Sequence, residues 1–219
     1  MTEGASGRSH ASSGRFITLE GGEGAGKSTQ IARLKSWLEG RGRSVVATRE
    51  PGGSPGAETI RKLLVEGPVE RWDGTTEALL HFAARREHLR STVWPALRRG
   101  DWVLSDRFAD STLAYQGYGH GVDRAIFDQL YKFAAGDFRP DLTVILDLPV
   151  ETGLLRAAAR RGSETRYESL PRDFHARVRS GFLEIANRDP KRCVVIDATG
   201  SIDSIAAAIA GAASERLGA

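Results

Sequence analysis

The sequence of 219 residues has one cysteine and no apolar run approaching the roughly 20 residues that a membrane-spanning helix needs. A single cysteine, Cys193, excludes an intrachain disulfide, and its place in the apolar run CVVID favours a buried structural thiol. The opening residues also lack the apolar core of a secretory signal. We therefore expect a protein without a membrane segment that works in the cytoplasm.

The chain also has little excess charge, since 31 basic and 28 acidic residues give a net charge of only +3. The basic residues are spread along the chain with acids between them, and no basic stripe with interleaved aromatic residues is present. Such a stripe is typical of nucleic-acid-binding proteins. We therefore expect no nucleic-acid partner.

The length and the hydrophobic content of 40% suit one well-buried domain. Residues 1–14 are mostly small and polar, with nothing to bury, and they predict a disordered N-terminal extension. Residues 15–219 show no internal repeat and no interdomain linker. We predict a single domain over this range.

Short apolar runs alternate with longer segments of helical period, which is typical of a parallel α/β sheet covered by helices on both faces. The predicted strands are Arg15–Glu20, Ser44–Arg49, Trp102–Asp106, Leu142–Leu148 and Cys193–Asp197, each apolar enough to be buried on both faces. The predicted helices are Lys27–Glu39, Thr59–Val65, Thr75–Arg90, Asp123–Ala135, Glu151–Arg161, Pro171–Arg188 and Ile202–Leu217. Ser54 before Pro55 is a further signal for the start of the second helix.

The motif G-x-x-x-x-G-K-[ST] occurs at Gly21, Gly26, Lys27 and Ser28, directly after the first strand and at the start of a helix. In this context the backbone N–H groups face a phosphate chain, the lysine reaches the outer phosphates and the serine hydroxyl can ligate Mg²⁺. The fold is then a three-layer fold of the P-loop NTP hydrolase type. The predicted ATP-binding residues here are Gly21, Gly22, Glu23, Gly24, Ala25, Gly26, Lys27, Ser28 and Thr29.

Charged residues follow two other predicted strands. Arg49 and Arg107 both project from the carboxyl edge of the sheet, where an open α/β fold places its ligands, and two arginines there can grip an acceptor phosphate. Asp106, at the end of the third strand, is positioned to hold Mg²⁺ through water or to orient an arginine. The alternative for Asp106 and Arg107 is a surface ion pair.

A P-loop alone leaves open an ATPase, a GTPase switch, a motor or a small-molecule kinase. Four further segments, TREPGG from Thr48, EALLHFAARREHL from Glu77, SDRFADSTLAYQG from Ser105 and GDFRPDLTVILD from Gly136, narrow the choice. Together with the P-loop, in this order, they closely resemble bacterial thymidylate kinase, the family that phosphorylates dTMP to dTDP. The resemblance runs from about Arg15 to near the C-terminus.

Two residues four apart in a predicted helix, His81 and Arg85, share a face. The resemblance implies that the residue at position 81 stacks on thymine and that Arg85 donates to its O4 atom. A guanidinium has only donors, so it should reject cytosine, which presents an amine at that position. The family more often has Phe or Tyr where this chain has His81, and a histidine would change its charge near pH 6 to 7.

The segment after Arg107 supplies further candidates. By resemblance, Thr112 and Gln116 bond the edge of the thymine ring, Tyr115 packs beneath the deoxyribose, and Glu23 lies near the acceptor sugar and the magnesium. Ser111, one helical turn from Tyr115, completes the predicted dTMP-binding set of Glu23, Arg49, His81, Arg85, Arg107, Ser111, Thr112, Tyr115 and Gln116.

The arginine-rich segment from Arg156 to Glu168 resembles the lid of a nucleoside monophosphate kinase. The P-loop itself has no arginine at its variable positions, so by resemblance the lid should supply the positive charge that stabilises the transferring phosphoryl group. Arg160 and Arg166 are the preferred lid arginines, Arg161 is possible, and Arg156 is expected against the adenine.

The sequence thus predicts a dTMP kinase that uses ATP and Mg²⁺ and transfers the phosphoryl group in line, without a covalent intermediate. The predicted catalytic residues are Lys27, Asp106, Arg107, Arg160 and Arg166, and the predicted metal ligands are Ser28 and Asp106. Discrimination by the thymine methyl group is worth roughly 1 to 3 kcal/mol, so dUMP should be a poorer acceptor. A kinase for another nucleoside monophosphate and a non-catalytic nucleotide-binding protein are the alternatives. The resemblance also implies a homodimer.

Overall fold

The computed structural model of this chain describes residues 14–159 and 166–219, and within these ranges five parallel strands form one sheet. The order across the sheet is β2-β3-β1-β4-β5. The strands are β1 (Phe16–Glu20), β2 (Val45–Arg49), β3 (Trp102–Asp106), β4 (Leu142–Asp147) and β5 (Cys193–Asp197). The predicted α/β fold with a five-stranded parallel sheet is therefore confirmed. Residues 1–13, which hold nearly all of the predicted N-terminal extension, lie outside the described residues.

The register of the sheet brings the candidate residues to one edge. Leu19 of β1 and Arg49 of β2 are both paired with Asp106 of β3. Because all the strands are parallel, their carboxyl ends meet at this edge, and the P-loop leaves β1 beside the end of β3. Arg49 at the end of β2 and Asp106 at the end of β3 thus lie next to the P-loop.

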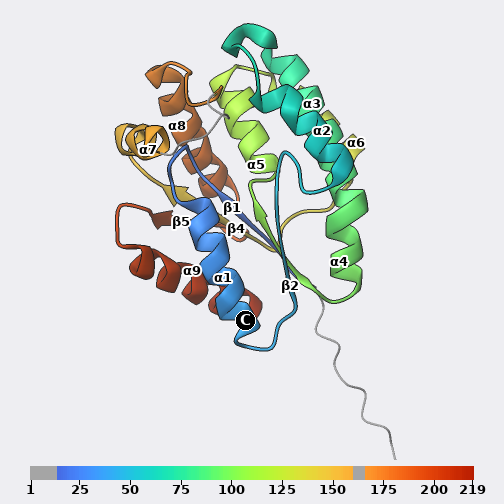
Figure 1. Cartoon of the computed structure of the whole chain (residues 1–219), viewed down its shortest axis with the longest axis vertical. Coiled ribbons are helices and arrows are strands. Elements are labelled where there is room, and N and C mark those ends of the chain that lie inside the picture. Colours follow the sequence, from blue (N-terminus) through green and yellow to red (C-terminus); the bar gives the residue numbers. More distant parts are fainter. Residues whose placement is uncertain (1–13, 160–165) are drawn as a thin grey trace, which may run out of the picture.

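The helices cover both faces of the sheet (Figure 1). They are α1 (Lys27–Glu39), α2 (Pro55–Val65), α3 (Gly74–His88), α4 (Trp94–Arg98), α5 (Ala109–Thr112), α6 (Arg124–Ala135), α7 (Val150–Ala158), α8 (Arg172–Arg188) and α9 (Ile202–Leu217), with a 3-10 turn over Val69–Arg71. Helix α2 begins at Pro55, directly after Ser54, whose hydroxyl accepts a hydrogen bond from the Ala57 N–H. This capped start lies before the apolar period that predicted the helix from Thr59.

Two apolar clusters, one on each face of the sheet, form the core. One contains Ile17 and Leu19 of β1 together with residues of α1 and α9, which lie side by side. The other contains Phe16 of β1 with aromatic and aliphatic residues of α3, α6 and α8. Alternate residues of one strand enter opposite clusters, as the period of two in a strand requires. The result is the three-layer arrangement predicted from the sequence.

The strands differ in burial according to their place in the sheet. The three central strands β1, β3 and β4 are almost completely buried. The edge strands β2 and β5 are partly exposed, with Val195 of β5 42% exposed. The prediction that every strand is buried on both faces is therefore wrong for the two edge strands, which lack a neighbour on one side.

Two π-helical segments interrupt the regular helical geometry. They are η2 (Leu89–Val93), which continues α3 into α4, and η3 (Leu113–Gly119), which continues α5. Segments of this kind recur at functional sites, because the wider turn changes which side chains share a face. The sequence pattern predicted neither segment. Among the described residues, no helix is both long and apolar enough to span a membrane.

Candidate functional site

The P-loop turns sharply between β1 and α1. Gly21, Gly24 and Gly26 have φ angles of 133°, 67° and 88°, a region that side chains rarely adopt. The Lys27 ammonium group donates to the carbonyls of Gly21 at 3.1 Å and of Gly22 at 2.9 Å. Burial, with Arg107 next in effect, lowers the pKa of Lys27 to about 8. The lysine side chain thus lies along the loop whose backbone is expected to hold a phosphate chain.

Ser28, the next residue, contacts the end of β3. Its hydroxyl donates to Asp106 Oδ2 at 2.7 Å, so the two predicted metal ligands are adjacent. Mg²⁺ usually takes one or two protein oxygens, with waters and substrate phosphates completing its shell. Among the described residues no group of three His, Cys, Asp or Glu side chains could hold a metal. A hydroxyl and one carboxylate beside a phosphate-binding loop fit that cation.

Arg107 joins β3 to the P-loop. Its φ of 69° is the only positive value among the described non-glycine residues, and it turns the side chain back toward the loop. The guanidinium donates to the Gly21 carbonyl at 2.9 Å, to Ser111 Oγ at 3.1 Å, to Glu23 Oε1 at 2.9 Å and to the Tyr115 hydroxyl oxygen at 3.1 Å. Arg107 therefore contacts both the P-loop side of the site and the side formed by α5 and η3.

Glu23 lies between these two sides. The Tyr115 hydroxyl donates to Glu23 Oε1 at 2.7 Å, on the same oxygen that Arg107 contacts. Burial alone raises the pKa of Glu23, but Arg107, Lys27 and the Tyr115 hydroxyl outweigh it and lower the pKa to about 2. Glu23 is thus a fixed negative charge inside the P-loop.

A cavity of about 690 Å³ opens over these residues. It brings together most of the predicted site: Glu23, Gly24, Ala25, Gly26, Lys27, Ser28, Thr29, Arg49, His81, Arg85, Asp106, Arg107, Ser111, Thr112, Tyr115, Gln116 and Arg156. Gly21 and Gly22 instead line a small crevice behind the loop. Arg160 and Arg161 lie outside the described residues.

The end of the cavity formed by α3 and η3 is lined by buried polar groups. Arg85, 1% exposed, donates from Nε to Glu50 Oε2 at 2.8 Å and from Nη2 to Thr112 Oγ1 at 2.8 Å. Gln116 donates from Nε2 to Glu77 Oε2 at 2.8 Å. Within residues 14–159 and 166–219, Arg85 Nη1 and Gln116 Oε1 are buried without a hydrogen-bond partner.

His81 lines the same end of the cavity, and its Nε2 lies 3.2 Å from the Tyr167 hydroxyl. Burial, with Arg85 and Arg107 next in effect, lowers the pKa of His81 to about 3. The expectation that His81 changes its charge near pH 6 to 7 is therefore wrong. In the folded protein it is a neutral ring.

Two predicted ligand arginines are held by other groups at the rim. Arg49 makes a two-pronged contact with Glu58, at 3.3 Å from Nε and 3.0 Å from Nη2. Arg156 of α7 donates to the Ala198 carbonyl at 3.2 Å, just after β5. Both side chains line the cavity, Arg49 at the end of β2 and Arg156 on α7.

Arg166 does not lie where a lid arginine was predicted. It is 5% exposed and donates to the carbonyls of Leu64, Pro68 and Val69 at 2.7 to 3.1 Å. Its Nη2 also lies 2.5 Å from Glu77 Oε1. These contacts hold the guanidinium against the end of α2 and the turn that follows it, and Arg166 is not among the cavity-lining residues. The structure therefore does not bring Arg166 to the phosphate-binding loop.

Sequence reasoning missed three buried glutamates that hold the predicted residues. Glu20 accepts hydrogen bonds from the Phe108 N–H at 2.7 Å and the Ser111 hydroxyl at 2.5 Å. Burial, together with Asp110, raises the pKa of Glu20 to about 8. Glu50 and Glu77 hold Arg85 and Gln116. A glutamate inside an apolar strand or helix face was the available signal for Glu20 and Glu77.

Glu50 also fixes a histidine behind Arg85. His88, which is completely buried, lies with Nδ1 2.9 Å from Glu50 Oε1 and Nε2 2.7 Å from Thr48 Oγ1. Because a carboxylate only accepts, Nδ1 carries the proton that it donates to Glu50. His88 is thus a buried structural residue that holds Glu50 in place.

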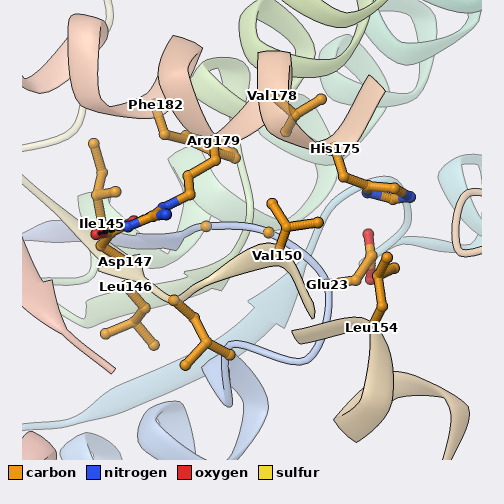
Figure 2. Close-up of a pocket in the computed structure, with 13 residues that line it drawn as sticks. Glu23, Ile145, Leu146, Asp147, Val150, Leu154, His175, Val178, Arg179 and Phe182 are labelled. Atoms are coloured by element: carbon orange, nitrogen blue, oxygen red, sulfur yellow. Dashed lines mark hydrogen bonds and ion pairs between the residues drawn. The ribbon is translucent and has the colours of Figure 1, made fainter. Parts of the chain in front are cut away.

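The crevice behind the P-loop, of about 20 Å³, lies between the end of β4, α7 and α8. Figure 2 shows His175 of α8 above Glu23, and Arg179 of the same helix reaching Asp147 at the end of β4. Arg179 contacts both carboxylate oxygens of Asp147, at 2.7 and 2.9 Å. Helix α8 is thereby fixed against the sheet edge that carries the site.

Comparisons with known proteins agree with this arrangement. The family model for thymidylate kinase matches residues 19–209. The chain is 55% identical to the thymidylate kinase of Caulobacter vibrioides, over 94% of this chain and 98% of that protein. It is 52% identical to the thymidylate kinase of a Bradyrhizobium strain, over 93% and 91% of the two chains.

Among solved structures, the thymidylate kinase of Ehrlichia chaffeensis superposes with a TM-score of 0.73. That protein is 35% identical in sequence, and the match covers 91% of this chain and 98% of that one. The sheet, the P-loop cavity and these similarities over nearly the full length lead to the same assignment. The chain belongs to the thymidylate kinase family.

Proposed function

We propose that this chain transfers the γ-phosphoryl group of ATP to dTMP and produces dTDP. Family membership supports the reaction, and the cavity supports the assignment of residues to it. The P-loop end would hold the phosphates of ATP, and the end formed by α3 and η3 would hold the thymine base. Transfer would be in line, by positioning and electrostatics, without a covalent intermediate.

The observation that carries the acceptor assignment is the pair of unpartnered buried atoms at the base end. Within the described ranges, Arg85 Nη1 is a donor and Gln116 Oε1 an acceptor, and neither has a partner. A buried polar atom without a partner costs about 1 to 3 kcal/mol, which a ligand can recover. Thymine presents an oxygen at C4 and an N–H at the adjacent N3, so it complements this pair.

Cytosine presents the opposite pattern, with an amine at C4 and an acceptor at N3. It would face the Arg85 donor with a donor and the Gln116 acceptor with an acceptor. Uracil keeps the thymine pattern and lacks only the methyl group. The pocket should therefore reject dCMP strongly and dUMP only by roughly 1 to 3 kcal/mol.

The phosphates would be held by the groups around the P-loop. Lys27 and the start of α1 supply positive charge to the donor phosphates. Arg107 stands between the P-loop and the acceptor side, and Arg49 lies at the rim, so both can contact the acceptor phosphate. Lys27 and Arg107 would stabilise the charge that develops on the transferring group.

Ser28 and Asp106 would hold the Mg²⁺ ion that accompanies ATP, since their oxygens are adjacent beside the P-loop. The ion supplies charge neutralisation between the β- and γ-phosphates when bound. Arg156 would lie against the adenine, and Arg160, outside the described residues, stays the proposed lid arginine. Gly21, Gly22, Gly24, Ala25, Gly26 and Thr29 would contribute the remaining ATP contacts, and Ser111, Thr112, Tyr115, His81 and Glu23 those of dTMP.

A homodimer is part of the proposal, because exposed apolar side chains lie on neighbouring helices. Leu63 of α2, Leu79 of α3, and Ile126 and Phe133 of α6 are 38%, 51%, 40% and 90% exposed. Helix α3 packs against both α2 and α6, as Figure 1 shows. Exposed apolar side chains on helices that pack together suit contact with a second copy of the chain. The cytoplasmic location expected from the sequence stays a prediction.

The test of the activity is an assay of ADP formation with ATP, Mg²⁺ and dTMP. We expect turnover that requires dTMP and is lost in the Lys27→Met variant, which keeps the size of the side chain but not its charge. Faster turnover of CMP or UMP than of dTMP would contradict the acceptor assignment. Sedimentation of the wild type and of Phe133→Glu tests the dimer, which the added charge should dissociate.

A further inference from the structure

Glu77 is a completely buried carboxylate that does not line the cavity, yet it contacts residues that do. It lies in the first turn of α3 and is 1% exposed. Gln116 Nε2 donates to its Oε2 at 2.8 Å and the Tyr167 hydroxyl to the same oxygen at 3.2 Å. Arg166 Nη2 lies 2.5 Å from its Oε1. Three groups from outside α3 therefore hold this side chain in place.

The chemistry of Glu77 decides which way the Gln116 amide is turned. A glutamine amide has a donor end and an acceptor end of nearly the same shape, so packing alone does not choose between them. A carboxylate only accepts hydrogen bonds, so the NH₂ group of Gln116 must face Glu77. The amide is planar, and Gln116 Oε1 is left at the other end, on a residue that lines the cavity. Among the described residues this oxygen has no partner.

We propose that Glu77 is a positioning residue for base selection. Through Gln116 it makes the base end of the pocket present a hydrogen-bond donor and, beside it, an acceptor. This inference rests on the proposed function and deepens it. Arg85 supplies the donor whatever its surroundings, because a guanidinium has no acceptor. Gln116 supplies an acceptor only because Glu77 fixes its amide. The ligand class selected is a base with a carbonyl beside a ring N–H, and thymine and uracil belong to it.

The Glu77→Gln variant tests this directly, because Arg166 dictates how the introduced amide is turned. Arg166 also has only donors, so it holds the carbonyl oxygen of the introduced amide and directs the NH₂ group of that amide toward Gln116. Gln116 must then turn its own oxygen toward the introduced amide and its own NH₂ group toward the base. The Gln116 NH₂ group, a donor, would then face the N3–H of thymine, which is also a donor. We expect kcat/KM for dTMP to fall about 10- to 100-fold, mainly through KM, and the dTMP to dCMP ratio of kcat/KM to fall with it.

A double-mutant cycle separates this role from a structural one. In a Gln116→Leu background there is no amide to orient, so Glu77→Gln should change the KM for dTMP less than about two-fold further. The matched control is His120→Gln, since His120 Nε2 lies 3.7 Å from Glu77 Oε2 but His120 does not line the cavity. We expect the dTMP to dCMP ratio of this control to lie within about two-fold of the wild type.

Equal losses from Glu77→Gln in both backgrounds, or an unchanged dTMP to dCMP ratio in that variant, would overturn the proposal. If Glu77→Gln does not fold, the test is the rate at which the side-chain amide protons of Gln116 exchange with solvent in the wild type. Their signals are assigned by comparison with Gln116→Leu. Slow exchange with solvent before and after addition of dTMP supports the bond to Glu77. Exchange as fast as that of a surface glutamine would overturn it. A wild-type protein that turns over no dTMP would contradict the proposed function instead, so the two failures are distinguishable.

Discussion

The Arg107 guanidinium donates to Glu23 Oε1 at 2.9 Å and so links the end of the third strand to the middle of the P-loop. The same side chain reaches the Gly21 carbonyl at 2.9 Å. A residue from the acceptor side thus holds the loop that would bind the donor. One side chain thus joins the two halves of the site.

Removing the charge of Glu23 should weaken this link. The pKa of Glu23 is about 2 in the folded protein against an ordinary 4.5, so its charge stabilises the fold above pH 4.5 and loses that effect as the pH falls through 2. For Glu23→Gln we expect a lower free energy of unfolding, by about 2 to 3 kcal/mol at pH 6. Denaturant unfolding should show the gap to the wild type narrowing below pH 4.5. The exposed Glu215→Gln serves as control, and a gap that is constant with pH would contradict the account.

Glu20 should have the opposite pH dependence. Burial and Asp110 raise the pKa of Glu20 to about 8, so its protonated form is stabilised by folding. The stability that protonated Glu20 contributes to the fold is fully present below pH 4.5 and is lost as the pH rises through 8. Glu20→Gln should therefore gain stability relative to the wild type between about pH 5 and 8, with a slope of up to about 1.4 kcal/mol per pH unit. Parallel stability curves for the two proteins over this range would show that the carboxyl is ionised throughout.

His81 should not act as a pH-dependent residue. Burial and the neighbouring arginines lower the pKa of His81 to about 3, so the ring stays neutral from about pH 5.5 to 7.5. The ratio of the KM for dTMP between the wild type and His81→Phe should then be constant over this range. The phenyl ring offers more stacking area, so we expect this variant to have a KM lower by roughly 2- to 10-fold. A ratio that changes around pH 6.5 would indicate a protonated histidine in the folded protein.

Arg166 should matter for stability more than for phosphoryl transfer. Arg166→Met leaves Glu77 buried beside fewer donors and leaves three carbonyls without their partner. We expect a loss of about 3 to 5 kcal/mol in the free energy of unfolding. The kcat of the folded fraction should fall less than about ten-fold. An unchanged melting temperature with a kcat reduced about 100-fold or more would return Arg166 to the predicted lid role.

The fold and the positions of the site were largely predictable, because their causes are local. Short apolar runs predicted all five strands, and a motif placed Lys27 and Ser28 between a strand and a helix, where the structure has them. Since parallel strands end at one edge, Arg49 and Asp106 had to lie at the same edge, and the sheet order makes them neighbours there. The capped start of α2 at Ser54 was also readable from two adjacent residues.

The contacts between distant segments were not predictable in this way. Arg166 looked free to face the P-loop, but the carbonyls of Leu64, Pro68 and Val69 converge on it from 97 to 102 residues earlier in the chain. The low pKa of His81 depends on burial and on arginines from several elements. The π-helical segment Leu113–Gly119 changes the spacing that an α-helical period assumes for Ser111 and Tyr115. Each of these depends on tertiary packing that a single sequence does not reveal.

Recognition of the acceptor base is proposed to depend on Arg85 Nη1 and Gln116 Oε1, which would bond to the edge of the ring. Its most direct measurement is kcat/KM of the wild type for dTMP, dUMP and dCMP, determined with saturating ATP and Mg²⁺. We expect the highest value for dTMP and a value lower by roughly 5- to 150-fold for dUMP. The value for dCMP should be lower still, by about 1000-fold or more, since both of its edge contacts are mismatched. A kcat/KM for dCMP within about ten-fold of that for dTMP would contradict this proposal.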